Sequence, residues 1–203
     1  MIKRGENVLI TNNAIKNSFV NYSNKDTKLS REVKNKKYIK VVNGLYETNP
    51  NVLGYYLAGA IYGPSYLSFD FALAYYGLIP EQVKNYTSAT FNKKKKKTYK
   101  NAFGIYLYRD VPKKAYPYGI DIISEGNYSY QIATKEKALC DKLYTLSPVN
   151  NLKQFEELLF DDLRIDKYEL SKFNLEDVEF LEKKYHTTNV TFLYKYLRRE
   201  KNE

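Results

Sequence analysis

The stretch Thr27–Thr48, TKLSREVKNKKYIKVVNGLYET, decides the fold of the N-terminal part of the chain. It predicts a helix over 27–36, because Leu29 and Val33 stand four positions apart and share one helical face. It then predicts a β-hairpin, in which YIKVV and LYET are joined by Asn43-Gly44. This pair is the strongest two-residue turn pattern, and in its usual form both central residues take a positive φ.

The predicted helix carries its positive charge off the apolar face. A basic helix that leads into a two-stranded wing is typical of a winged helix-turn-helix, which places its second helix in a major groove and its wing against the backbone. We therefore interpret residues 1–49 as a domain for double-stranded DNA, bound as a monomer or homodimer; the alternative is an ordinary solvated helix face. The predicted DNA contacts are Lys28, Ser30, Arg31 and Lys34 on the helix, and Lys36, Lys37, Lys40 and Asn43 in the wing.

Composition agrees with a polyanionic partner. The chain has 203 residues, a net charge of +10 and 43% hydrophobic residues, enough to bury a core. Residues 1–50 hold ten Lys and Arg against four Asp and Glu, whereas residues 151–203 hold ten against twelve. The positive charge is therefore densest where the helix and hairpin are predicted.

The single cysteine, Cys140, excludes an internal disulfide and a cysteine-based zinc site, which fits a reducing cytoplasm. No apolar run reaches the roughly 20 residues that span a bilayer, and the N-terminus does not read as a signal peptide. We expect a cytoplasmic protein with no membrane partner.

The rest of the chain predicts a mixed α/β domain over 50–203 with a helical C-terminal end, so the whole fold is α+β. Thr11 is expected to cap a helix within 2–22, Pro50 to begin a helix, and Ser68 to cap a helix that stops at Gly77. The other expected elements are a hairpin over 86–108 with Lys93–Lys97 at its tip, a hairpin over 119–133, a helix after Thr134, and helices over 152–160, 166–172, 175–185 and 190–199.

Several motifs across residues 27–170 together resemble the AbiEi family of abortive-infection antitoxins, which belong to type IV toxin–antitoxin systems. Lys135 stands where the family usually has proline, a mild departure because proline only pre-sets the first helical turn. The matching segments are Asn43–Tyr46, Ser65–Ser68 with Gly77–Pro80, Thr87–Phe91, Phe103–Arg109 and Ile132–Ala138.

The resemblance implies two tasks. The N-terminal domain would bind inverted repeats in its own promoter and repress transcription. The C-terminal domain would counteract a nucleotidyltransferase-type toxin encoded alongside, by direct contact or by opposing the toxin's effect. The runner-up interpretation is a transcriptional regulator whose C-terminal domain senses a ligand or dimerises, with no toxin partner.

A second basic surface could serve DNA or the toxin. Its candidate residues are Lys93, Lys94, Lys95, Lys96, Lys97, Arg109 and Lys137. For the lysine run the alternatives are a phosphate-contacting arm, a clamp on an acidic partner and a solubilising loop. Lys137 or Arg109 could instead form a buried ion pair that orders the C-terminal domain.

No catalytic or metal site is predicted, and no cofactor. Glu136 and Asp141 lie five positions apart in a helical pattern, whereas an acidic nuclease site that includes Asp121 would place its acid and lysine along a strand. His186, the only histidine, has no serine or cysteine partner in view. The tyrosines at 55–76 are helically spaced, which favours packing over the stacking of nucleic-acid bases.

Overall fold

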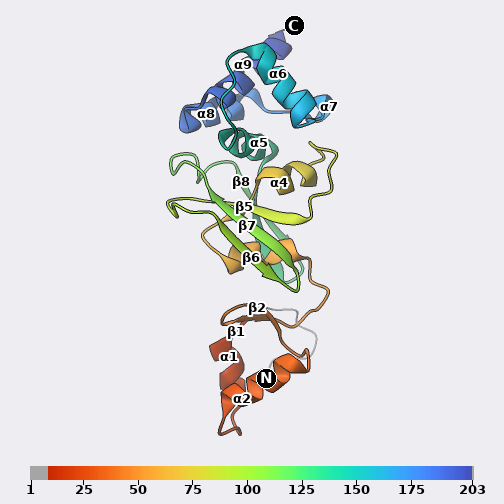
Figure 1. Cartoon of the computed structure of the whole chain (residues 1–203), viewed down its shortest axis with the longest axis vertical. Helices are drawn as coiled ribbons and strands as arrows, with labels where there is room; N and C mark the ends of the chain where they lie inside the picture. The colour runs from red at the N-terminus through yellow and green to blue at the C-terminus, as the bar shows by residue number, and fades with distance from the viewer. Residues whose placement is uncertain (1–8, 203) are drawn as a thin grey trace.

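The computed structural model describes residues 9–202 and shows an α+β protein with a helical C-terminal end. Figure 1 shows an N-terminal unit, a β-sheet and a group of helices following one another along the long axis of the molecule. We call residues 10–47 the N-terminal unit. Its elements are β1 (Ile10–Thr11), α1 (Asn12–Ser18), α2 (Lys25–Lys34), β2 (Ile39–Val42) and β3 (Leu45–Glu47).

The N-terminal unit is built on a three-stranded antiparallel sheet in the order β1-β3-β2. Thr11 caps α1 as expected, since its side chain accepts a hydrogen bond from the amide of Ala14. The part of the predicted helix range before residue 9 lies outside the described residues. A small core holds the two helices on the sheet, and its buried members are Ile10, Ile15, Phe19, Leu29 and Tyr38.

The hairpin is present, but its turn differs from the one expected. Val42 pairs with Leu45, so Asn43 and Gly44 are the two turn residues, and only Gly44 has a positive φ, +81°. The register shifts between Lys40 and Val42. Because such a bulge adds right-handed twist, the strands do not depend on a turn with two positive φ angles.

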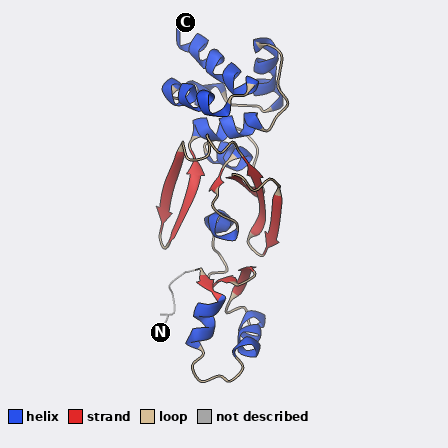
Figure 2. Cartoon of the chain, turned by 90° about the vertical axis from the view of Figure 1, so that its left-hand side faces the viewer, coloured by secondary structure: helices blue, strands red, loops and turns tan. Residues whose placement is uncertain are grey.

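A six-stranded mixed sheet forms the middle of the molecule, in the order β6-β7-β5-β4-β9-β8. Figure 2 shows its strands in two groups that splay apart, with a short helical segment between them. The strands are β4 (Tyr66–Leu67), β5 (Asn85–Thr90), β6 (Lys97–Asn101), β7 (Gly104–Asp110), β8 (Ile120–Glu125) and β9 (Tyr128–Ala133).

The hairpin predicted over 86–108 is wrong. β5 and β7 pair in parallel over Asn85–Thr90 and Gly104–Asp110, and β7 forms its hairpin with β6. β6, the first strand of that hairpin, is not indicated by the sequence because Lys97–Asn101 is too polar to resemble a strand. An edge strand tolerates lysine because one side of it faces solvent. The other predicted hairpin, β8–β9, is confirmed.

Short helices lie against the sheet: η1 (Gly54–Leu57), α3 (Ala58–Ile61), α4 (Phe69–Tyr75) and α5 (Lys135–Tyr144). No regular helix begins at Pro50, since Pro50 and Asn51 form a turn and Val52 and Leu53 are irregular. The hydroxyls of Tyr106 and Tyr108 donate to the carbonyls of Gly54 and Ala58, which fixes η1 and α3 on β7. Five of the six tyrosines of 55–76 pack in or against the core, as expected, whereas Tyr75 is exposed.

The C-terminal helices match the predicted ones closely. Asn174 caps α8 and Thr134 caps α5, both as expected. His186 ends α8 in the left-handed conformation, with φ of 50°. These helices are α6 (Leu152–Glu157), the π-helical turn η2 (Leu158–Asp162), α7 (Lys167–Ser171), α8 (Leu175–Tyr185) and α9 (Thr188–Asn202).

Ser68 does not cap α4 through its side chain. Its hydroxyl donates instead to Asp141 on α5, at 2.6 Å. Thr87 takes over at this helix start, because its hydroxyl accepts from the amide of Phe71 and donates to the carbonyl of Ser68. The exchange ties α4 to both the sheet and α5. Gly77 ends the helix region with φ of +70°, as expected.

Glu47 connects the N-terminal unit to the sheet. Its carboxylate is fully buried and accepts hydrogen bonds from the amides of Thr48 and Asn49 and from the hydroxyl of Tyr128 on β9. On the other side, the Asn101 side chain donates to the carbonyl of Val41, at 3.1 Å. The unit is thus hydrogen-bonded to both groups of strands.

Candidate nucleic-acid interface

The outer surface of α2 is a single exposed stripe. Thr27, Ser30, Arg31 and Lys34 recur at three- and four-residue intervals, and all four are exposed. Leu29 and Val33 lie on the opposite side, against the small core. The sequence identified three of these four residues as candidate contacts and missed Thr27, whose spacing from Ser30, Arg31 and Lys34 was the available indication.

The start of α2 is fixed by its cap. The Asn24 side chain accepts from the amide of Thr27 at 3.0 Å, and Asp26 adds a favourable carboxylate to the first turn. The helix therefore begins two residues earlier than the sequence predicted.

The end of α2 is a Schellman motif. Lys36 takes φ of 58°, and its amide donates to the carbonyl of Val33. The amide of Lys37 donates to the backbone carbonyl of Glu32. The helix thus ends at Lys34, two residues before its predicted end. Glycine usually occupies the left-handed position, so a lysine there gave no indication of the stop.

Lys28 lies on the flank of α2 and differs from the other predicted contacts. Its ammonium is 2.5 Å from the carboxylate of Glu32, and a second lysine, Lys37, is 3.7 Å from the same carboxylate. The hydrogen bond from Lys28 lowers the pKa of Glu32, and the hydrogen bond to Glu32 raises the pKa of Lys28. The Glu32 carboxylate therefore pairs with both Lys28 and Lys37. Lys28 is also only partly exposed.

The remaining predicted contacts surround the end of α2 and the hairpin. Lys36, Lys37, Lys40 and Asn43 are all exposed. Arg31 and Lys34 stand in the last turn of α2, directly before them. From the helix stripe to the hairpin turn, the predicted contacts other than Lys28 are therefore each exposed to solvent.

The lysine run is divided between two surroundings. Lys93 donates to the carbonyl of Gly63 and lies over the ring of Tyr62, while the amide of Lys94 donates to Asp110. Lys96 and Lys97 instead line a cavity of about 240 Å³ with Arg109 and Lys142. The sequence does not identify Lys142 as part of a basic surface, because most residues of its helix follow a buried pattern.

Lys137 is no part of a basic surface, so that assignment was wrong. Its side chain is fully buried and its ammonium lies 3.3 Å from Asp141, which makes the alternative, a buried ion pair, correct for Lys137. The ammonium also donates to the carbonyl of Ala115, at 2.9 Å, and to Tyr185. Arg109 is partly buried and donates to the carbonyl of Thr145.

Asp141 is the centre of this buried network. It accepts hydrogen bonds from Tyr66, Ser68 and Tyr185 in addition to its ion pair. Burial raises the pKa of Tyr66 and Tyr185, and the nearby Asp141 charge raises both further. Every polar group here has a partner in the protein, so the arrangement orders α5 against α4 and α8.

Glu136 and Asp141, the two helical carboxylates of a nuclease-type site, have different partners. Glu136 accepts from the amide of Asn174, whereas Asp141 faces the network above. Among residues 9–202, no three His, Cys, Asp or Glu side chains are grouped so that they could hold a metal ion. In the same range no helix is both long and apolar enough to cross a membrane.

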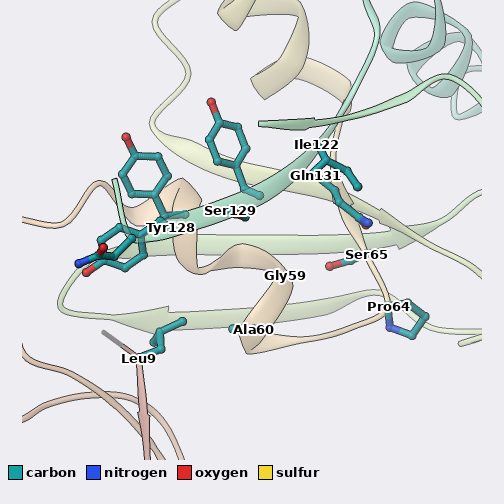
Figure 3. Close-up of a pocket in the computed structure, with 12 residues that line it drawn as sticks. Leu9, Gly59, Ala60, Pro64, Ser65, Ile122, Tyr128, Ser129 and Gln131 are labelled. Atoms are coloured by element: carbon teal, nitrogen blue, oxygen red, sulfur yellow. The ribbon is translucent and has the colours of Figure 1, made fainter. Parts of the chain in front are cut away.

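A larger cavity, of about 460 Å³, lies between η1–α3 and the β8–β9 hairpin (Figure 3). Tyr56, Tyr128 and Tyr130 form its aromatic part, and Ser65, Ser129 and Gln131 contribute polar side chains. Leu9, directly before β1, also lines it. Among residues 9–202, no charged side chain lines this cavity, and Leu9 places it next to the N-terminal unit.

Comparison with known proteins adds no relative: no family model matches this sequence, and no curated protein matches it.

Proposed function

We propose that this chain is an antitoxin of the AbiEi type that binds its own promoter as a winged helix-turn-helix repressor. The observation that carries the proposal is the exposed stripe of Thr27, Ser30, Arg31 and Lys34 on α2, followed directly by the exposed Lys36 and Lys37 and the β2–β3 hairpin. In this proposal α1 and α2 are the two helices of the motif, and β2–β3 is the wing.

The stripe suits major-groove contact because it combines side chains of different chemistry. Arg31 can donate two parallel hydrogen bonds to the edge of a guanine, while Ser30 and Thr27 can donate or accept. Lys34, Lys36, Lys37 and Lys40 would contact phosphates, which position the protein without reading sequence. Two copies would cover an inverted repeat and block the promoter.

The antitoxin part of the proposal assigns residues 50–203 to counteracting a nucleotidyltransferase-type toxin. It rests on the sequence motifs of the sheet and of α5, which resemble the family. Tyr66 and Ser68 of one motif donate to Asp141, just beyond another, so two of the motifs are joined in the buried network. The motifs would therefore maintain the fold of the antitoxin part, and its surface would act on the toxin or on the toxin's effect.

The DNA-binding proposal is tested by titrating a labelled duplex of the gene's own promoter with the full chain. Arg31→Ala should weaken binding by about 1–3 kcal/mol, the range for loss of one specific base contact. Arg198→Ala is the matched control, because Arg198 is exposed on α9 at the far end of the molecule (Figure 1). Equal affinity of the Arg31→Ala variant and the parent would reject α2 as the recognition helix.

The antitoxin proposal is tested by co-expression with the adjacent nucleotidyltransferase-like gene in a host that this gene kills. Rescue by the full chain, retained in the Arg31→Ala variant, would place antitoxicity outside the DNA contact. Absence of rescue by a folded, well-expressed chain would reject the antitoxin role and leave the DNA-binding proposal standing.

The second candidate function is a transcriptional regulator that senses a ligand. The cavity of about 460 Å³ favours it, because a neutral, tyrosine-lined space beside the N-terminal unit could couple ligand binding to DNA affinity. A small molecule that stabilises the chain and changes its affinity for the promoter, with no toxic neighbour gene, would favour this candidate over the antitoxin.

A further inference from the structure

We infer that the cavity of about 240 Å³ beside α4 is a binding site for a phosphoryl group. The inference goes beyond the proposed DNA contact, which is assigned to α2 in the N-terminal unit. The cavity is lined from the edge of the sheet by Lys96, Lys97 and Arg109, and from α5 by Lys142. Four cations thus gather from separate segments around one small space.

The charge of this lining is unbalanced. Among residues 9–202, Asp70 is the only acidic residue that lines the cavity, and its carboxylate is 2.5 Å from the ammonium of Lys142. One of the four cations is therefore neutralised, which leaves a net charge of +3. Like charges held together raise the energy of the empty site, and a multiply charged anion would relieve that repulsion.

Arg109 has the geometry that a phosphoryl group requires. The residue is partly buried, and its guanidinium donates a hydrogen bond of 3.3 Å to the carbonyl of Thr145 at the end of α5. A guanidinium fixed at one end still presents further N–H groups in a planar fork, which matches two oxygens of a phosphate. The two lysines next to it in the lining supply additional point charges.

The lysine run is used selectively, which separates this site from a solubilising loop. Lys93 is committed to the carbonyl of Gly63 and the ring of Tyr62, and the backbone of Lys94 is tied to Asp110. Lys96 and Lys97 line the cavity whereas Lys95 does not, and Lys97 is held there by its strand pairing with Tyr108 on β7. A loop that served only solubility would need no such division.

The size of the cavity restricts the ligand. At about 240 Å³ it is smaller than the roughly 300–1,000 Å³ of sites for drug-sized molecules, so it would hold a phosphate or pyrophosphate group and little more. The group could be free in solution or be the end of a nucleotide whose remainder lies outside. Phe69 and Leu107 at the lining offer apolar contact to such a remainder.

The inference is tested by isothermal titration calorimetry of the full chain at matched ionic strength. The ligands are inorganic phosphate, pyrophosphate, AMP and adenosine. We expect saturable binding of the phosphoryl compounds, with Kd at or below about 1 mM, and no binding of adenosine. Tighter binding of AMP than of phosphate would identify a nucleotide end, and equal binding the free anion; both support the site. Absence of saturable binding of all phosphoryl compounds would overturn it.

Variants then locate the binding. Lys96→Gln/Lys97→Gln should weaken the binding of pyrophosphate at least tenfold, and Arg109→Lys should weaken it by loss of the planar fork. Lys95→Gln is the matched control within the same run and should leave binding unchanged. Equal weakening in the control and the site variants would show a general charge effect and reject the cavity. Promoter affinity, measured alongside, distinguishes failure of this site from failure of the DNA-binding proposal.

Discussion

The hydroxyl of Tyr128 donates a hydrogen bond of 3.0 Å to the buried carboxylate of Glu47, which joins the last strand of the N-terminal unit to the central sheet. The two residues are 81 positions apart in the sequence. A buried carboxylate needs all its hydrogen bonds, and this one takes two from its own backbone turn and one from β9.

Tyr128→Phe should therefore destabilise the protein by about 1–3 kcal/mol, the cost of leaving a charged group one hydrogen bond short. Chemical denaturation would give the free energy of unfolding, and amide exchange of β3 should accelerate because the unit is less firmly held. Tyr168→Phe is the control, since Tyr168 is 71% exposed and should change stability negligibly. A Tyr128→Phe variant as stable as the parent would contradict the coupling.

Removing the buried ammonium should be more costly. Lys137→Met leaves Asp141 charged in a fully buried position, and the expected loss is about 3–5 kcal/mol. The double variant Lys137→Met/Asp141→Leu should regain part of that loss, because neither charge then remains buried alone. Urea denaturation of Lys137→Met, Asp141→Leu and the double variant provides the measurement. If the double variant loses the sum of both single losses, the two residues do not act as a pair.

Stability should fall in alkali. Burial raises the pKa of Tyr76 and Tyr116 to about 12, and raises those of Tyr106 and Tyr108 further, whereas an exposed tyrosine titrates near 10.0. A raised pKa in the folded state means that the unfolded chain releases its protons first. The stabilisation is therefore complete below pH 10 and is lost as the pH rises from there through the folded values, by up to about 1.4 kcal/mol per pH unit for each tyrosine.

Tyrosinate absorbance followed together with circular dichroism would check this expectation. The buried tyrosines named above should ionise only at a pH above 10, as the chain unfolds. The same titration in denaturant, where all tyrosines are exposed, is the control. Titration of every tyrosine near pH 10 with native circular dichroism would contradict the burial described here.

The cap of α2 offers a test that connects stability to DNA binding. Asn24→Ala removes the acceptor for the amide of Thr27 and should cost about 1 kcal/mol of stability. Promoter affinity should fall as well, because the first turn presents Thr27. Asn17→Ala, an exposed change inside α1, is the control. Lower stability with unchanged affinity would show that the first turn does not contact DNA.

Local patterns in the sequence predicted most single elements. Asn43-Gly44, Thr134 and Asn174 marked a turn and two helix starts correctly, because each acts on atoms only a few residues away. The end of α2 escaped because Lys36 adopts a conformation that glycine usually takes. Ser68 escaped because a distant carboxylate, Asp141, competes for its hydroxyl.

Strand order could not be read in this way. Two strands that seem to follow each other in the sequence predict an antiparallel hairpin, which is why the sequence predicts one for β5 and β7. In the structure β6 lies between them in the sequence and at the edge of the sheet, and β5 and β7 are parallel. The candidate sites show the same limit. Exposure of Arg31 and Lys34 followed from helical spacing, but burial of Lys137 depended on Ala115 and Tyr185, which only the tertiary fold brings to it.

The central sheet is narrowest at β4, which contains only Tyr66 and Leu67. It meets β5 through the pairs Tyr66–Ala89 and Leu67–Ser88, and β9 through the pair Leu67–Ile132. Within the sheet, β6, β7 and β5 on one side are therefore joined to β9 and β8 on the other only through the two residues of β4. The N-terminal unit is hydrogen-bonded to both groups of strands. A rotation of one group against the other would therefore distort the few residue pairs of β4 and would also move the N-terminal unit.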